Sequence, residues 1–162
     1  MPQYHMRKKE KQITDPAEID IIIQKSKYSV IAMSMDNQPY LVSLSHGYDK
    51  KENALYYHCA AKGRKIDYIR SNPNVCATII DDGGYQQECN HHYTSIVIFG
   101  KMEFMEDLED KKHGINILFD HLEDNPDIIR KREIKSDKSY KKVQVLKLTI
   151  EELTAKYHSK IE

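Results

Sequence analysis

Apolar and polar side chains alternate along much of the chain, and this alternation predicts a succession of short β-strands. Residues 28–35 and 40–48 alternate in this way around a turn at residues 36–39, so they predict a β-hairpin. Four more strands are expected at residues 55–59, 74–80, 93–105 and 143–150. Two aspartates and two glycines at 81–84 predict the end of the strand before them, and Gly100 predicts a bulge or bend within the longest strand.

Other segments have apolar residues at helical spacing. The first follows Asp15, which is placed as an N-cap before a helix that begins at Pro16. The second lies after the third expected strand and is ended by an Asn-Pro pair at residues 72–73, and a third covers residues 107–122. The highly charged residues 124–142 are expected to be partly helical and partly mobile. Six strands joined mostly by short turns, with few helices, predict an α+β protein: a small antiparallel barrel with peripheral helices.

Composition limits the classes of partner. The chain has 162 residues, with 25 basic and 25 acidic side chains, which suits one compact domain spanning residues 1–162. Because there is no net charge to steer it, neither nucleic acid nor an acidic membrane surface is an expected partner, and any anion site must be local. The polar beginning of the chain, and the lack of an apolar run of about 20 residues, predict a cytoplasmic location.

Between the third strand and the second helix lies a basic turn, Lys62-Gly63-Arg64-Lys65. Free backbone N–H groups and the positive end of a helix dipole favour an anion at such a turn, and an arginine there can add a bidentate contact. The sequence therefore predicts a phosphate site. The alternative is a solvated basic turn on an ordinary connection between a strand and a helix.

Histidine and cysteine residues suggest further chemistry. His58 ends the strand just before the basic turn, and its imidazole titrates near neutral pH, so it is a candidate for proton transfer, although a structural role is the alternative. Cys89, His91 and His92 offer too few ligands for a closed zinc site, because adjacent strand residues face opposite ways. No metal is therefore expected. The three cysteines are scattered, which argues against a disulfide framework.

Longer motifs resemble a known family. YHCAAKGRKIDYIRSNPNVCATI, and later YTSIVIFGKMEFMED, resemble the pyridoxamine 5'-phosphate oxidase-like split-barrel flavoproteins, and most closely their 5-nitroimidazole resistance, or nitroimidazole reductase-like, branch. ITDPAEIDIIIQKSKYSVIAM, PYLVSLSHGY and IEELTAK are also similar to that branch. The resemblance covers residues 7–156 and implies an FMN-binding split barrel of six strands that forms a homodimer.

The resemblance also implies roles for individual residues. FMN would lie across the subunit interface, with its phosphate on the basic turn and with His58 assisting catalysis beside the flavin. The implied cofactor-binding residues are Val42, Ser43, Leu44, Ser45, His58, Cys59, Lys62, Arg64, Lys65, Ser95, Ile96 and Val97.

Substrate choice is left open by the same motifs. The chain has no tryptophan and lacks the C-terminal tryptophan and arginine motif with which pyridoxamine phosphate oxidases hold their substrate, so vitamin B6 chemistry is not expected. The favoured function is reduction of small electron-poor organic molecules such as 5-nitroimidazoles. Because no GxGxxG motif is present, NAD(P)H would visit only transiently. The alternatives are a non-catalytic flavin-binding module for storage or sensing, and, more weakly, a barrel that binds haem or a deazaflavin.

Overall fold

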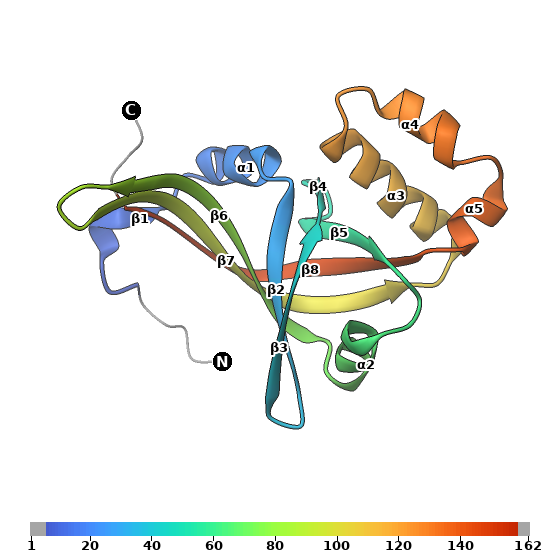
Figure 1. Cartoon of the computed structure of the whole chain (residues 1–162), viewed down its shortest axis with the longest axis horizontal. Coiled ribbons are helices and arrows are strands. Elements are labelled where there is room, and N and C mark those ends of the chain that lie inside the picture. Colours follow the sequence, from blue (N-terminus) through green and yellow to red (C-terminus); the bar gives the residue numbers. More distant parts are fainter. Residues whose placement is uncertain (1–5, 159–162) are drawn as a thin grey trace.

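The computed structural model describes residues 6–158, which form one antiparallel sheet of eight strands with helices around it (Figure 1). In chain order the elements are η1 (Lys9–Lys11), β1 (Gln12–Ile13), α1 (Pro16–Lys25), β2 (Tyr28–Met35), β3 (Gln38–Ser45), β4 (Gly47–Asp49), β5 (Ala54–Cys59), α2 (Arg64–Ser71), β6 (Asn74–Gln86), β7 (Asn90–Met105), α3 (Leu108–Leu122), α4 (Pro126–Glu133), α5 (Asp137–Lys141) and β8 (Gln144–His158). None of the helices within these residues is long and apolar enough to cross a membrane.

The order of strands shows how the sheet curls. Neighbouring strands follow the order β3-β2-β6-β7-β8-β5-β4, and β1 pairs with β8 outside this path. The two ends of the order, β3 and β4, are separated in the chain by His46 alone. The sheet therefore bends round until its two edges meet at this residue, although no strand pairing joins them among residues 6–158. The result is a split barrel of the α+β class, as predicted.

The prediction of six strands was wrong by two. One addition is the two-residue strand β1. The other arises because the strand expected over residues 40–48 is two strands, β3 and β4, interrupted at His46. The backbone N–H of His46 donates a hydrogen bond to the carbonyl oxygen of Lys27, 3.3 Å away. The alternation of exposed and half-buried side chains in β3 stops at this corner, where residues 46–49 are all buried.

Strands β6 and β8 are longer than predicted. The residues at 81–84 do not end β6, because a bulge between Asp82 and Gly84 leaves only Gly83 out of the pairing and the strand continues to Gln86. Gly84 has φ +86°, a left-handed conformation that glycine adopts without strain. Strand β8 continues past residue 150 as far as His158. Together β6, β7 and β8 form a long arm beyond the barrel (Figure 1).

The bulge predicted at Gly100 is confirmed. The pairing of β7 with β8 shifts register between Phe99 and Gly100. A Cβ atom added at Gly100 would collide with the carbonyl oxygen of Thr149 in β8. Only glycine permits this close approach of two backbones at the bend.

Apolar side chains fill the inside of the curled sheet. Tyr57, Ile98 and Leu146 have almost no exposed surface there. Helix α1 covers one end of the barrel and α2 the other (Figure 1), burying Ile23 and Ile69 respectively. A smaller cluster lies outside the barrel, where α3 and α5 pack on the outer face of β5 and β8; it contains Ala54, Tyr56, Ile115, Leu118, Tyr140 and Val145.

His46 is a polar residue buried at the corner between β3 and β4. Its ring has no exposed surface, and neither ring nitrogen has a hydrogen-bond partner among the described residues. The ring centroid lies 5.1 Å from that of His121 in α3. Burial, with the nearby His121 and Lys27, lowers the pKa of His46 to about 4. The backbone of Ile23 opposes this lowering of the pKa, because it favours the charged ring. It does not, however, lie within hydrogen-bond geometry of either ring nitrogen.

This buried ring predicts a loss of stability in mild acid. A histidine in the unfolded chain has a pKa near 6.5, so as the pH falls from 6.5 towards 4 the unfolded state takes up the proton first. The free energy of unfolding is then reduced by about 2 kcal/mol at pH 5 relative to pH 7. We expect urea unfolding at these two pH values to show a smaller acid loss in His46→Gln than in the parent. Equal losses in the two proteins would contradict the assignment to His46.

Candidate functional site

The basic turn ends at the N-terminus of α2, and its backbone is open to a ligand. Gly63 is the N-cap residue, and its φ of +130° is a conformation that side chains rarely adopt. No side chain caps the helix, so its first backbone N–H groups are not satisfied by a capping residue. The turn at Lys62 and Gly63 is exposed. The geometry is that of an anion site at a helix N-terminus.

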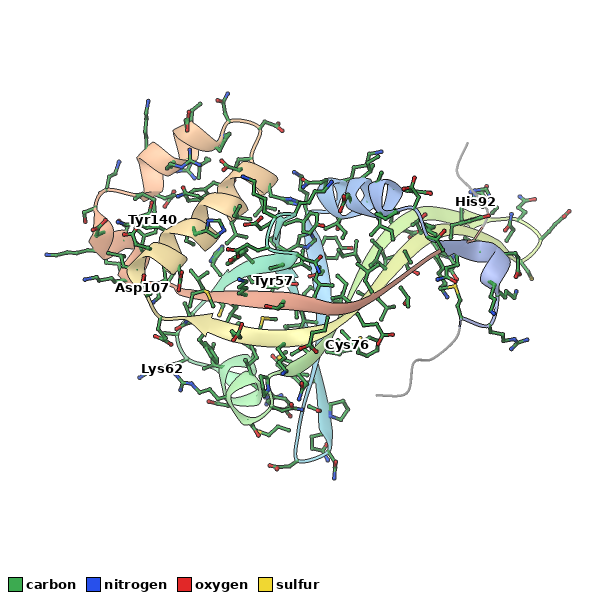
Figure 2. All side chains as sticks on the ribbon, turned by 180° about the vertical axis from the view of Figure 1, so that it is seen from behind. Tyr57, Lys62, Cys76, His92, Asp107 and Tyr140 are labelled. Carbon is green, nitrogen blue, oxygen red and sulfur yellow. The ribbon has the colours of Figure 1, made fainter. Side chains whose placement is uncertain are left out.

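Cationic side chains surround this N-terminus. The exposed Arg64 places its guanidinium 5.6 Å from the ring centroid of Tyr40 in β3, which ties the turn to that strand. Burial raises the pKa of the Cys59 thiol, and the ammonium of Lys65 opposes the rise. Lys65 and Cys59 therefore lie close together, on the side of β5 that faces α2. Lys62 is exposed at the edge of the molecule (Figure 2).

Strand β3, next to the turn, has two different faces. Val42 and Leu44 are half-buried and pack against the barrel core. Ser43 and Ser45 alternate with them and are exposed on the outer face. Because β3 is an edge strand of the sheet, one side of its backbone has no strand partner among residues 6–158. That edge is available to donate and accept hydrogen bonds with a flat polar ligand.

The candidate cofactor-binding residues in β7 also lie on two different faces of their strand. Ile96 has no exposed surface and belongs to the core, so its side chain does not reach the outer face. Ser95 and Val97 point to the outer face instead, with Ser95 buried and Val97 half-buried. Ser43 pairs with Val30 of β2, which pairs with Thr78 of β6, which in turn pairs with Val97. Ser43 and Val97 therefore lie in one row across the sheet. Three strand spacings separate Ser43 from Val97, about 14 Å.

This outer face of β3, β2, β6 and β7 is uncovered. Directly paired residues of an antiparallel sheet point to the same face, so Leu41, Ile80 and Phe99 share the face with the Ser43–Val97 row. Their exposed fractions are 62%, 51% and 40%. Exposed apolar side chains that gather on one sheet face mark an interaction surface.

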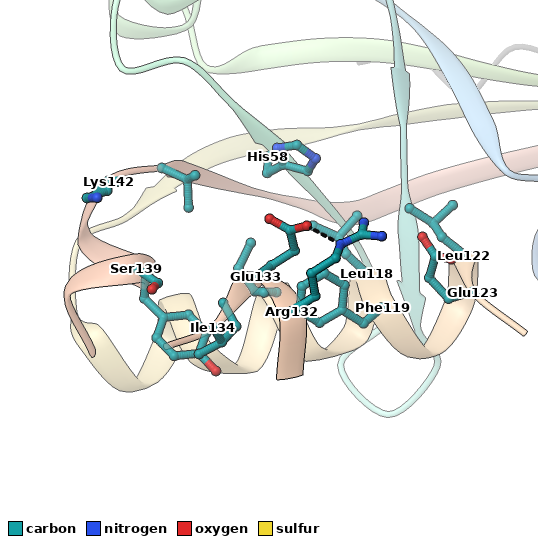
Figure 3. Close-up of a pocket in the computed structure, with 13 residues that line it drawn as sticks. His58, Leu118, Phe119, Leu122, Glu123, Arg132, Glu133, Ile134, Ser139 and Lys142 are labelled. Carbon is teal, nitrogen blue, oxygen red and sulfur yellow. Dashed lines mark hydrogen bonds and ion pairs between the residues drawn. The ribbon is translucent and has the colours of Figure 1, made fainter. Parts of the chain in front are cut away.

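His58 points away from the basic turn. Adjacent strand residues face opposite sides, so His58 faces the helices α3–α5 while Cys59 faces Lys65. The imidazole lines a cavity of about 480 Å³ between β5 and these helices (Figure 3). The other lining residues are Ile115, Leu118, Phe119, Leu122, Glu123, Arg132, Glu133, Ile134, Ser139, Tyr140, Lys142 and Val143.

Two residues of the basic run Arg130-Lys131-Arg132 have tertiary roles that the sequence did not predict. Arg130 donates hydrogen bonds to Asn116 and Asp120 of α3 at 2.8 and 2.7 Å, so it fastens α4 to α3. Arg132 lines the cavity. Both contacts join residues that lie more than nine positions apart, and periodicity within one helix does not predict them.

A second group missed from the sequence joins β4, the turn after it, α3 and β8. The carboxylate of Asp49 is buried and lies 2.7 Å from His113 Nε2, and Glu52 lies 2.8 Å from the ammonium of Lys147. Burial raises the pKa of Asp49, but hydrogen bonds from His113 and the backbone outweigh it and hold that pKa below its ordinary value. The ligand atoms of Asp49, Glu52 and His113 lie within 4.8 Å of one another. Because Lys147 already pairs with Glu52, these groups act as an ion-pair network.

The histidines considered for a metal lie elsewhere. His91 pairs with Asp82 at 2.8 Å in the arm, and Cys89 is exposed at its turn. His92 and Lys62 are at opposite ends of the molecule (Figure 2). Within this chain, the arm and the basic turn therefore do not form a common site.

Comparison with known proteins identifies the family. A model of the family described as pyridoxamine 5'-phosphate oxidase matches residues 15–157. The chain belongs to this flavin-binding family. A search of the curated proteins finds no match.

Solved structures of similar fold come from several bacteria. A candidate 5-nitroimidazole antibiotic resistance protein from Bacteroides thetaiotaomicron is 28% identical, with a TM-score of 0.77 over 90% of this chain and 86% of the other. The flavocytochrome Anf3 from Azotobacter vinelandii is 16% identical, with a TM-score of 0.80 over 97% of this chain and 73% of the other. An FAD and heme binding protein from Mycobacterium smegmatis is 18% identical, with a TM-score of 0.76 over 93% and 74% of the two chains. At these identities the last two similarities concern the fold alone.

Proposed function

We propose that this protein binds FMN and reduces small electron-poor organic molecules such as 5-nitroimidazoles. The observation that carries the proposal is the uncapped, cationic N-terminus of α2 beside the open edge of β3, in a chain that belongs to a flavin-binding family. The similarity to the Bacteroides protein supports the choice of substrate. Flavin, when bound, supplies the redox chemistry, and the protein supplies binding, orientation and protons.

The residues at the turn fit the phosphate of FMN. The backbone N–H groups at the start of α2 and the guanidinium of Arg64 would hold the phosphate oxygens, with Lys62 and Lys65 adding positive charge. Ser43 and Ser45 lie on the neighbouring edge strand, where the backbone offers the donors and acceptors that the polar edge of a flavin needs. A monophosphate matches the one helix N-terminus at this turn, which is why FMN is proposed.

The uncovered outer face supports a homodimer with the flavin between subunits. Ser43 and Val97 are about 14 Å apart within one subunit, so β7 of a second copy is better placed to close over a flavin held by the first. A two-fold interface buries the same patch on both subunits, which would cover Leu41, Ile80 and Phe99 together.

His58 is proposed to assist proton transfer during turnover. Its exposed imidazole lies one residue before Cys59, which faces the turn, so the end of β5 adjoins both the cavity and the phosphate site. Imidazole can donate or accept a proton near neutral pH. NAD(P)H is proposed as a transient electron donor. A non-catalytic flavin-binding module is the second candidate, and it differs in needing no proton donor.

The first test concerns the phosphate. Arg64→Ala should weaken FMN binding by about tenfold to a hundredfold, because a hydrogen bond to a charged group contributes roughly 1.5–3 kcal/mol. Arg70→Ala is the matched control, since Arg70 lies in the last turn of the same helix over the Phe104 ring and should leave the affinity unchanged. Fluorescence titration with FMN measures both. Equal affinity in folded Arg64→Ala and parent protein would falsify the phosphate assignment.

The second test concerns assembly. Light scattering of the flavin-loaded protein should give twice the chain mass of 19.0 kDa. Ile80→Lys should shift the mass towards one chain, because it places a charge in the centre of the apolar face. Ile128→Lys is the control, since Ile128 is 60% exposed on α4, away from that face. A parent mass of one chain with flavin bound would exclude the interface.

The third test separates the two candidate functions. His58→Ala should retain FMN and lower the rate of nitro-substrate reduction by the pre-reduced flavoprotein by about 10²-fold or more. His92→Ala, at the far end of the molecule, should leave the rate unchanged. Equal rates in His58→Ala and parent protein would make His58 structural and would favour the storage or sensing function.

A further inference from the structure

The cavity between β5 and helices α3–α5 has the size and lining of a small-molecule site. Its volume of about 480 Å³ falls within the range usual for ligand pockets. One wall is apolar and comes from consecutive turns of α3, where Leu118 is buried and Phe119 and Leu122 are half-buried. Tyr140 of α5 adds an aromatic side chain. A flat apolar molecule is the complement of such a wall.

Arg132 is a polar group at the open side of this cavity, and 67% of its side chain is exposed. Its Nε donates a hydrogen bond to Glu133 Oε1 at 2.6 Å (Figure 3). Among residues 6–158, neither of its two terminal nitrogens has a hydrogen bond or ion pair. The contact with Glu133 restrains the guanidinium and partly neutralises that carboxylate, while the Nη edge can still bind a carboxylate in bidentate fashion.

The remaining polar lining limits how a ligand can lie. Lys142 brings a positive charge at the opposite end of the lining from Arg132 (Figure 3), and His58 offers an imidazole from β5. Glu123 lies next to Leu122 on the apolar wall and disfavours an anion at its own end. An acidic group is therefore placed at the Nη edge of Arg132, with the apolar body along α3.

We propose that this cavity binds a flat, mostly apolar molecule that has one carboxylate, with the carboxylate paired to the Nη edge of Arg132. The cavity is distinct from the phosphate turn, because His58 faces the cavity whereas Cys59 and Lys65 face that turn. A ligand can occupy the cavity while FMN occupies the turn. The inference concerns binding alone, so it holds whether or not the ligand is also the electron acceptor.

The test compares 2-naphthoate with 2-naphthamide, which have the same ring system and differ in charge. Isothermal titration of the FMN-saturated protein should show 2-naphthoate binding about tenfold more tightly or better. Arg132→Gln should abolish this difference, and Lys131→Gln, at the neighbouring basic residue outside the cavity lining, should preserve it. Leu122→Trp should fill the cavity and weaken both probes.

Several outcomes would overturn the proposal: no binding of either probe, equal affinities for the two, or 2-naphthoate binding that survives both Arg132→Gln and Leu122→Trp. The Arg64→Ala protein without flavin distinguishes this failure from failure of the proposed function. In that protein the phosphate turn lacks Arg64. If 2-naphthoate still binds to it, the probe binds in the cavity and not at the turn. Loss of 2-naphthoate binding in Arg64→Ala alone would place the probe at the turn and refute the cavity site.

Discussion

The architecture depends on one constraint: the two edges of the sheet, β3 and β4, are consecutive in the chain and meet at His46. This connection forces the sheet to curl, and the bend at Gly100, where β7 and β8 approach closely, accommodates the curl. The inner face becomes a closed apolar core covered at its ends by α1 and α2. A fully buried imidazole at the corner shows how tightly the joint is enclosed.

Curling also divides the outer face into two regions with different chemistry. Helices α3 and α5 cover the part formed by β5 and β8 and leave a cavity against His58. The part formed by β3, β2, β6 and β7 remains uncovered and apolar, with Ile80 and Phe99 exposed. The end of β5 adjoins both regions, since His58 faces one side and Cys59 the other. One short strand thus brings a proton-transfer candidate and a phosphate turn together from opposite faces.

Much of the candidate site was predictable because it is local in sequence. The turn at Lys62–Lys65 follows a strand and begins a helix, and the structure shows Gly63 as the N-cap with a left-handed φ. The alternation in β3 also predicted which positions share a face. The position of the Ile96 side chain was not predictable, because the sequence of a strand does not reveal which of its faces lies inside a barrel. The structure places this side chain in the core. The family match supports flavin binding as a property of the whole chain.

The sequence by itself determined the local features: the hairpin at 28–45, the capped start of α1 at Asp15, the basic turn and the glycine bend at residue 100. Each rests on backbone preference or on short-range periodicity, which neighbouring residues encode. Only the tertiary structure decided which strands are neighbours, that β3 and β4 separate at His46, and that Arg132 and His58 line one cavity. These contacts join residues far apart in the chain, so packing of the whole molecule sets them and no local pattern records them.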